Sequence, residues 1–351
     1  MADFTPDYRH IVDAAYNRIP TRMPLYDHSV DHTIIEAILD EPVGELFAAS
    51  GADLEEGMRR YNRFFVRMGY DACPFERGVC GVLPGGGALG DHQPGCIKTM
   101  DDFEQYPWQE IPDRFFFRHK ADYEALARTL PPGMKAVGGV GNGVFECVQD
   151  VVGYMDLCVI RYDDPELYAS LFEKMGEVLL AIWERLLRTY GDQFCVCRIG
   201  DDLGFKTMTL LPPEDIREHI VPVYRRIVAL VHSFGKPFLL HSCGNIFAVM
   251  EDFISTVGID AKHSNEDAIA PFQEWVERYG DRIGNFGGID CDVLCMCPPD
   301  EIQEMTREII RQARPHGGFA FGTGNSVPHY IPLDAYVAMN EAARAERQRH
   351  L

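Results

Sequence analysis

Lys236-Pro-Phe-Leu-Leu-His-Ser-Cys-Gly244 is an apolar run that ends in two residues able to bind a metal ion. Such a short apolar run is typical of a strand buried on both faces of a parallel sheet. His241 and Cys243 offer an imidazole nitrogen and a thiolate sulfur, which suit zinc. The alternative is a buried cysteine beside a hydrogen-bonded histidine, because short motifs often occur by chance. The position of the pair in the fold favours the metal site.

Similar apolar runs recur along the chain, separated by longer amphipathic segments. They predict eight strands, at 23–28, 70–76, 135–140, 194–199, 236–241, 259–263, 282–289 and 318–323. Helices are predicted to begin at Pro165, after an acidic cap, and at the proline pairs 212–213 and 298–299. The second of these runs to Phe234, and Pro222 within it predicts a kink.

This alternation of strands and helices predicts an α/β fold, namely a (βα)8 TIM barrel. We expect one domain over residues 1–351, with barrel strands from about 23 to 323. N-terminal helical additions are expected within 31–68 and 78–130.

Composition excludes several classes of function. Hydrophobic residues make up 46% and charged residues 25% of the 351 residues, which is typical of a soluble globular protein. The net charge of -21 disfavours binding to nucleic acid or to anionic membranes. No apolar run approaches the roughly 20 residues that span a bilayer. Met1-Ala-Asp-Phe-Thr-Pro6 has neither a basic start nor an apolar signal core, so we expect a cytoplasmic protein.

Polar side chains gather at the predicted C-terminal ends of the strands, where TIM barrels carry their chemistry. The residues at or just after these ends are Tyr26, His28, Glu76, Asn142, Asp201, Asp202, His241, Cys243, Glu266 and Asn325, with His329 nearby. The opposite ends carry Lys135, Lys236 and Arg282. This asymmetry predicts an enzyme. For Asp201 and Asp202 a capping role in the following turn is an equal alternative.

Four segments resemble the uroporphyrinogen decarboxylase superfamily. They are Asp201-Asp-Leu-Gly204, Phe238-Leu-Leu-His-Ser-Cys-Gly-Asn245, Gly287-Gly-Ile-Asp290 and Gly322-Thr-Gly-Asn-Ser-Val-Pro328. Within this superfamily the chain looks closer to the corrinoid-dependent methyltransferase branch than to the decarboxylases. The resemblance spans nearly the whole chain and implies a (βα)8 barrel with an open funnel, in agreement with the strand count.

The decarboxylase branch carries an N-terminal cluster of arginines that binds substrate carboxylates. The matching region here, Asn17-Arg-Ile-Pro-Thr-Arg-Met-Pro-Leu-Tyr-Asp-His28, lacks the arginine cluster after the first predicted strand. A tetrapyrrole with eight carboxylates needs cations. Porphyrinogen decarboxylation is therefore the less favoured alternative.

The methyltransferase branch implies zinc on His241 and Cys243, and Glu266 fits the place of a further ligand. Thiol-methylating members have another cysteine after the eighth strand, where this sequence has Asn325. A site with one sulfur, one nitrogen and one or two oxygens is more Lewis-acidic than a thiolate-rich one.

The sequence and the resemblance together predict a zinc-dependent methyltransferase. It would move a methyl group between a small methylated substrate, such as an aryl methyl ether, and a corrinoid (cobalamin) carried by a partner protein. We expect Asp201, Asp202 and His329 to act in catalysis. We expect the substrate to contact Tyr26, His28, Glu76, Asn142 and Asn325.

Three alternatives stay open. The first is transfer from methylcorrinoid to a thiol or folate, for which Asn325 makes the thiol less favoured. The second is decarboxylation of the uroporphyrinogen type, and the third is a barrel that binds a ligand without catalysis. The sequence also leaves a homodimer open.

Overall fold

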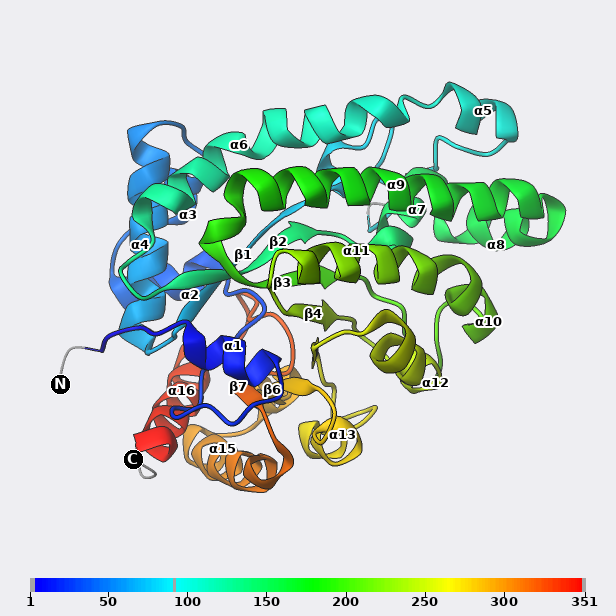
Figure 1. Cartoon of the computed structure of the whole chain (residues 1–351). Coiled ribbons are helices and arrows are strands. Elements are labelled where there is room, and N and C mark those ends of the chain that lie inside the picture. The colour runs from blue at the N-terminus through cyan, green and yellow to red at the C-terminus, as the bar shows by residue number, and fades with distance from the viewer. Residues whose placement is uncertain (1–3, 91–92, 349–351) are drawn as a thin grey trace.

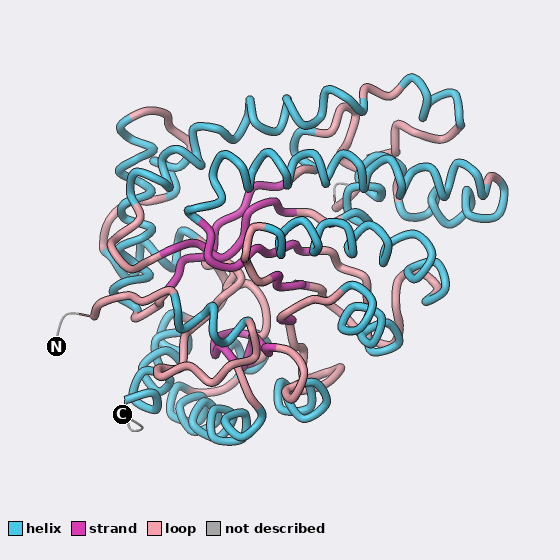
Figure 2. The backbone as a smooth tube through the Cα atoms, in the orientation of Figure 1, coloured by secondary structure: helices cyan, strands magenta, loops and turns pink. Residues whose placement is uncertain are grey.

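A computed structural model describes residues 4–90 and 93–348. A curled parallel sheet lies at the centre, and helices surround it (Figures 1 and 2). Within the described residues, no helix combines the length and the apolar character that crossing a membrane requires.

The sheet of the described residues has seven strands in sequence order, and every neighbouring pair is parallel. The strands are β1 (Ala72–Gly78), β2 (Lys135–Gly141), β3 (Phe194–Gly200), β4 (Phe238–His241), β5 (Ala261–His263), β6 (Gly284–Ile289) and β7 (Phe319–Thr323). Each corresponds to a predicted strand. Parallel strands in sequence order require a crossover between each pair, and helices provide these crossovers.

The first predicted strand, at 23–28, is only partly confirmed. Leu25 forms a single parallel bridge with Phe321 of β7, and the backbone N–H of Tyr26 donates to the Phe321 carbonyl at 2.9 Å. Pro24 has no N–H to extend a ladder. Among the described residues, this segment has no ladder with β1. The fold is therefore TIM-barrel-like, with seven strands and a bridging segment where an eighth would lie.

The helices of the described residues cover the outside of the sheet (Figure 1). They are α1 (Arg9–Ala15), α2 (His32–Leu39), α3 (Gly44–Phe47), α4 (Ala52–Met68), α5 (Met100–Gln105), α6 (Ile111–Thr129), α7 (Val144–Val152), α8 (Tyr154–Asp163), α9 (Pro165–Tyr190), α10 (Pro213–Asp215), α11 (Val221–Ser233), α12 (Phe247–Glu251), α13 (Phe272–Tyr279), α14 (Cys291–Met296), α15 (Pro299–Ala313) and α16 (Leu333–Gln348). The segment 31–68 contains α2 to α4, and the segment 78–130 contains α5 and α6.

Proline and acidic caps set the helix boundaries that the sequence predicts. The side chain of Asp164 accepts a hydrogen bond from the Leu167 N–H at 3.0 Å, and α9 begins at Pro165. The helix predicted from the 212–213 proline pair to Phe234 is interrupted by a π-helical turn at Ile216–Ile220, which ends two residues before Pro222. Pro222 cannot donate the regular backbone hydrogen bond, which accounts for the wider turn.

The N-terminal end of the sheet is closed by α1. Apolar residues from every strand meet α1 in one inner cluster: Ile11, Ala14, Ala15, Tyr26, Ala72, Val137, Cys195, Val196, Leu239, Ala261, Phe286 and Ala320. Because β1 and β7 both contribute, the sheet curls until its two edge strands face the same interior. A side chain at Gly284 would overlap the Ala14 carbonyl, so glycine there lets α1 approach. The opposite end carries the polar residues described next.

Candidate functional site

The candidate site lies where β3, β4 and β5 end. β4 ends at His241, β5 ends at His263, and Asp201 and Asp202 directly follow β3. His241 pairs in register with Gly200 on β3 and with His263 on β5. Residues in register on neighbouring parallel strands project to the same face, so the two imidazoles are side by side. Gly200, the residue of β3 in the same register, has no side chain and so leaves space beside His241.

His241 and Cys243 have the spacing of two ligands on one metal ion. The His241 Nε2 and Cys243 Sγ atoms are 3.5 Å apart. Zinc bonds of about 2.0 Å to nitrogen and about 2.3 Å to sulfur, at a tetrahedral angle, place these atoms about 3.5 Å apart. Gly244 has a φ of +81°. A side chain at Gly244 would also overlap the backbone of Gly204, so glycine lets the loops after β3 and β4 meet.

Asp202 is the carboxylate that joins this pair. Its Oδ1 atom lies 3.9 Å from His241 Nε2 and accepts a hydrogen bond from the Cys243 N–H at 2.9 Å. The three ligand atoms of Asp202, His241 and Cys243 lie within 4.8 Å of one another. The Asp202 side chain is 45% exposed, so it has room to rotate toward an ion. These three residues are therefore a mixed oxygen, nitrogen and sulfur donor set.

The sulfur of Cys243 has two further neighbours. Asn325 Nδ2 donates to Cys243 Sγ at 3.2 Å, and Ser264 Oγ lies 3.9 Å from the same sulfur. Burial, followed by the charge of Asp202, raises the pKa of the Cys243 thiol to about 12. A bound cation favours the thiolate, as do hydrogen bonds donated to the sulfur.

A second group of described residues, His28, His241 and His263, also has ligand atoms within 4.8 Å. His241 Nδ1 and His263 Nδ1 are 2.7 Å apart. Two nitrogens on one tetrahedral zinc ion lie about 3.3 Å apart, so the shorter distance indicates a hydrogen bond between the rings. His28 stacks on His241 with ring centroids 3.8 Å apart. We therefore assign His28 and His263 to the surroundings of His241.

Burial favours the neutral form of these histidines. Burial lowers the pKa of His263 to about 3, and it brings the pKa values of His28 and His241 well below the usual range. The guanidinium of Arg198 contributes to each shift. Neutral imidazole is the form that binds metal ions. Protons therefore compete only weakly with a metal ion for the His241 nitrogen.

Arg198 organises the other side of the site, and sequence reasoning missed it. This buried side chain donates to Tyr26 OH at 2.7 Å and to the His28 carbonyl at 2.9 Å, and forms an ion pair with Glu76 at 2.7 Å. Glu76 Oε1 lies 3.7 Å from His28 Nε2. The sequence offered one sign of this role, because Arg198 is a charged residue inside the otherwise apolar strand at 194–200.

Asp201 lies beside the site but is engaged by a helix. Its carboxylate accepts from the N–H groups of Phe145 and Glu146, at the start of α7, and from Tyr224 OH at 2.9 Å. The geometry therefore favours the capping role for Asp201. Asp201 caps α7, however, and not the turn that follows Asp201 in the sequence. Burial raises the pKa of Asp201 to about 7.

Asn142 contacts a carboxyl that was absent from the predicted set, Glu146. Asn142 Nδ2 donates to Glu146 Oε2 at 3.0 Å, while the Asp202 N–H donates to Glu146 Oε1 at 3.4 Å. Burial, followed by the charge of Asp201, raises the pKa of Glu146 to about 8. Glu146 follows the third predicted strand, and this place near a strand end was its sequence signal.

Two predicted residues stand apart. Glu266 lies in the loop after β5, where its carbonyl accepts from the Ile269 and Ala270 N–H groups, and among the described residues it belongs to neither potential metal group. That turn sets its backbone, and the carboxylate that lies 3.9 Å from His241 Nε2 is that of Asp202. His329 is exposed and contacts the ring of Tyr330, outside the cluster.

Two cavities flank the site and share Ser326. One, of about 480 Å³, is polar and includes Lys206, Glu266 and Asn325. The other, of about 280 Å³, is lined by His28, Glu76, Arg198 and the rings of Phe47, Tyr61 and Phe75, among others. Both lie at the strand ends, as expected for substrate cavities.

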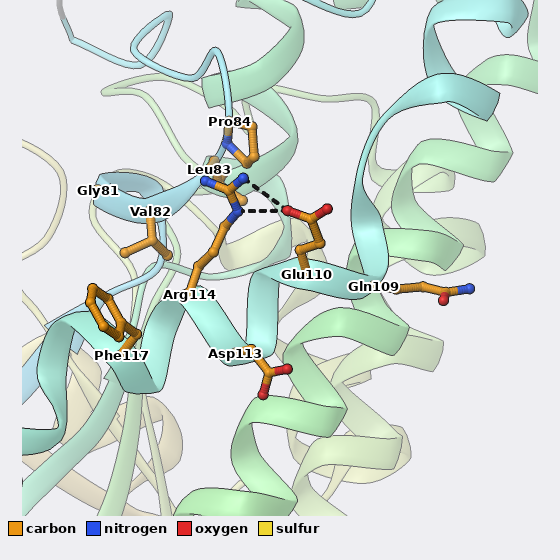
Figure 3. A pocket seen from close by; sticks show the side chains of 9 residues that line it. All are labelled: Gly81, Val82, Leu83, Pro84, Gln109, Glu110, Asp113, Arg114 and Phe117. Carbon is orange, nitrogen blue, oxygen red and sulfur yellow. Dashed lines mark hydrogen bonds and ion pairs between the residues drawn. The ribbon is translucent and has the colours of Figure 1, made fainter.

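A further cavity, of about 740 Å³, lies between the 81–84 loop and the start of α6. Figure 3 shows Arg114 paired with Glu110 there and Phe117 beside them. None of the predicted site residues lines it. We therefore keep it separate from the candidate site.

Comparisons with known proteins agree with the fold. The model of one family, described as uroporphyrinogen decarboxylase (URO-D), matches residues 94–346. Two curated relatives described as uroporphyrinogen decarboxylase, from Streptomyces avermitilis and Streptomyces coelicolor, are 23% and 22% identical over 193 residues. These alignments cover 54% of this chain and 50% of each relative, so the chain matches only about half of their length.

Solved structures match over nearly the whole chain. A methyltransferase from Methanosarcina mazei has a TM-score of 0.72 and 16% identity, and the match covers 96% of this chain and 97% of that chain. A putative vitamin-B12 independent methionine synthase from Listeria monocytogenes has a TM-score of 0.52 and 12% identity, over 93% and 98%. At these identities the likeness establishes a shared fold.

Proposed function

This chain belongs to the uroporphyrinogen decarboxylase family, and from this premise we propose that it is a zinc-dependent methyltransferase. It would transfer a methyl group between a small methylated substrate and the corrinoid of a partner protein. The observation that carries the proposal is the 3.5 Å separation of His241 Nε2 and Cys243 Sγ, with Asp202 beside them.

The donor set suits an oxygen leaving group. His241, Cys243 and Asp202 would hold zinc, and zinc when bound supplies a Lewis acid that stabilises negative charge on the leaving heteroatom. Asn325 occupies the other side of the sulfur and donates a hydrogen bond to it, where a further cysteine would add a second thiolate. One thiolate neutralises the ion less than two, which favours release of an alkoxide or phenoxide.

The cavity beside His28 supports an aromatic substrate. Three aromatic rings line it, and its volume of about 280 Å³ suits a small molecule. Both arginines of the lining are already ion-paired, Arg198 with Glu76 and Arg77 with Asp122. A neutral aryl methyl ether therefore fits better than a porphyrinogen with eight carboxylates, which would need unpaired cations.

The partner would approach from the strand ends that carry the site. The opposite end of the sheet is filled by α1 and the inner apolar cluster. Asp202, with its 45% exposed side chain, lies on the accessible side of the proposed metal site. If the ether oxygen of a substrate faced the proposed metal site, its methyl group would be accessible from these strand ends, and the oxygen would leave as an alkoxide or phenoxide when a partner's reduced corrinoid accepted the methyl group.

The direct experiment is a methyl-transfer assay with the full chain. Zinc-loaded protein is mixed with a reduced corrinoid acceptor and a panel of methoxylated aromatic compounds, and the methylcorrinoid formed is followed by its absorbance. We expect transfer by the wild type and by Cys295→Ser, whose cysteine is exposed, and loss of transfer in Cys243→Ser. Equal rates for the two variants would reject the proposed site.

Decarboxylation is the second candidate, because the family and its curated relatives carry that description. The same preparations are incubated with uroporphyrinogen without corrinoid, and the products are separated by the number of carboxylates. We expect no loss of carboxylates. Decarboxylation that survives Cys243→Ser would replace the proposed function with this one.

A further inference from the structure

We propose that His263 is a positioning residue, which fixes the proton of His241 on Nδ1 and so leaves the Nε2 lone pair of His241 facing Cys243. This inference rests on the proposed function for its consequence, because His241 matters there as a metal ligand. The tautomer itself is a property of the protein without any metal.

The first step is the contact between His263 and Thr323. His263 Nε2 lies 3.2 Å from the Thr323 carbonyl oxygen. A carbonyl oxygen has lone pairs and no hydrogen, so it can only accept. The proton of neutral His263 is therefore on Nε2, and its Nδ1 carries a lone pair.

The second step is the contact between the two rings. His241 Nδ1 and His263 Nδ1 are 2.7 Å apart, a distance that requires one hydrogen between them. Since His263 Nδ1 is an acceptor, His241 Nδ1 must be the donor. The lone pair of His241 is then on Nε2, which lies 3.5 Å from Cys243 Sγ and 3.9 Å from Asp202 Oδ1.

Neutral rings are required by this assignment, and the surroundings provide the reason. His241 is 5% exposed and His263 is fully buried. The buried guanidinium of Arg198, which donates to the His28 carbonyl at 2.9 Å and to Tyr26 OH at 2.7 Å, already places one positive charge in this buried region. A doubly protonated imidazole would therefore be buried without a carboxylate contact at its Nδ1 atom.

The Thr323 carbonyl, which accepts from His263, belongs to a residue that is itself held by hydrogen bonds. Thr323 donates to Asp27 Oδ1 from its N–H at 2.9 Å and from its hydroxyl at 2.8 Å. The other oxygen of Asp27 accepts from Tyr336 OH at 2.9 Å and from Tyr70 OH. A hydrogen-bonded path thus runs from Asp27 through Thr323 of β7 and His263 of β5 to His241 of β4, and the register of β4 with β5 aligns the two histidines.

Partners of metal-binding histidines typically change metal affinity 10–100-fold when they are removed. His263→Leu removes the acceptor at similar volume, and we expect zinc affinity to fall by about this factor. His263→Asn places an amide oxygen close to the position of Nδ1. We expect that variant to stay within a few-fold of the wild type.

The test measures the tautomer in metal-free full-length protein labelled with ¹⁵N at histidine. Two-bond ¹⁵N–¹H correlations distinguish a proton on Nδ1 from one on Nε2, and the His241 signals are those missing from His241→Gln. We expect Nδ1–H for His241 and Nε2–H for His263. The opposite tautomer for either ring would overturn the proposal.

Zinc affinity provides the second readout, measured by competition with a chromophoric chelator. We expect a 10–100-fold loss for His263→Leu and recovery in His263→Asn. Equal affinity of both variants and the wild type would also overturn the proposal. If His263→Leu fails to fold, the wild-type tautomer and the Asn variant still decide it. If the wild type binds no zinc, the proposed function fails, while the tautomer is still measured.

Discussion

Replacing Asp202 should identify the third ligand of the proposed zinc site. In the wild type, the Cys243 N–H donates to Asp202 Oδ1 at 2.9 Å. Asp202→Asn keeps an oxygen that can accept this hydrogen bond, so the loop should keep its conformation. It removes the negative charge that lies 3.9 Å from His241 Nε2. Because loss of an outer partner costs 10–100-fold, loss of a ligand should cost more than about 100-fold in affinity, or about 2.7 kcal/mol.

Thermal unfolding with and without zinc measures this loss of zinc affinity. At free zinc 100 times the wild-type Kd, binding stabilises the folded wild type by about 2.7 kcal/mol. A variant with 100-fold weaker affinity gains only about 0.4 kcal/mol at the same zinc concentration. Chelator competition gives the Kd directly, and unfolding without zinc shows whether the substitution alone alters stability.

Glu266→Gln is the matched control, because it also removes one carboxylate near the strand ends. Glu266 belongs to neither group of described residues that could hold a metal, so its zinc affinity should stay at the wild-type value. If Glu266→Gln loses the zinc-dependent stabilisation and Asp202→Asn keeps it, the reasoning from the ligand geometry is refuted.

Three further outcomes follow from the structure. Gly143→Ala should destabilise the fold by about 1–3 kcal/mol in urea unfolding, because its methyl group would overlap the buried Asp201 side chain; an unchanged urea midpoint would contradict this. Burial raises the pKa of Glu146 from 4.5 to about 8, so the folded state binds more protons than the unfolded state between these values. Stability should therefore fall as pH rises through this window, and Glu146→Gln should flatten that part of the profile; a parallel profile would argue against the raised pKa. Asn325→Cys should bring a second thiolate beside Cys243, raising zinc affinity and slowing transfer from an aryl ether; faster transfer would refute the Lewis-acid argument.

The strands and their polar ends were predictable because both depend on local patterns. The apolar run before His241 is β4, and the parallel order of the sheet brings the strand ends to one edge. The placement of His241 and Cys243 follows from that order. Only the first predicted strand differs, since the segment around Pro24 forms a bridge and no ladder.

The carboxylate beside His241 and Cys243 was less predictable because its position depends on loop conformation. Glu266 has a suitable sequence separation from His241, but among the described residues it belongs to neither group whose ligand atoms lie within 4.8 Å of one another. Asp202 reaches the pair because the loops after β3 and β4 pack at Gly204 and Gly244. Such contacts between distant loops have no local sequence pattern.

The roles of His263 and Arg198 could not be predicted either, because they depend on how separate strands align. The sequence places His263 at a strand end, but its pairing with His241 requires the alignment of β4 with β5. Arg198 appears in the sequence as one charge in an apolar strand, and its contacts with Tyr26, His28 and Glu76 come from separate segments. Only the folded chain brings these groups together.

Zinc K-edge X-ray absorption of the zinc-loaded full chain tests the donor set most directly. The wild type should show one sulfur at about 2.3 Å with nitrogen and oxygen neighbours at about 2.0–2.2 Å, and Cys243→Ser should lose the sulfur contribution. A spectrum without sulfur, one with two or more sulfurs, or one unchanged in Cys243→Ser would contradict a site built from His241, Cys243 and Asp202.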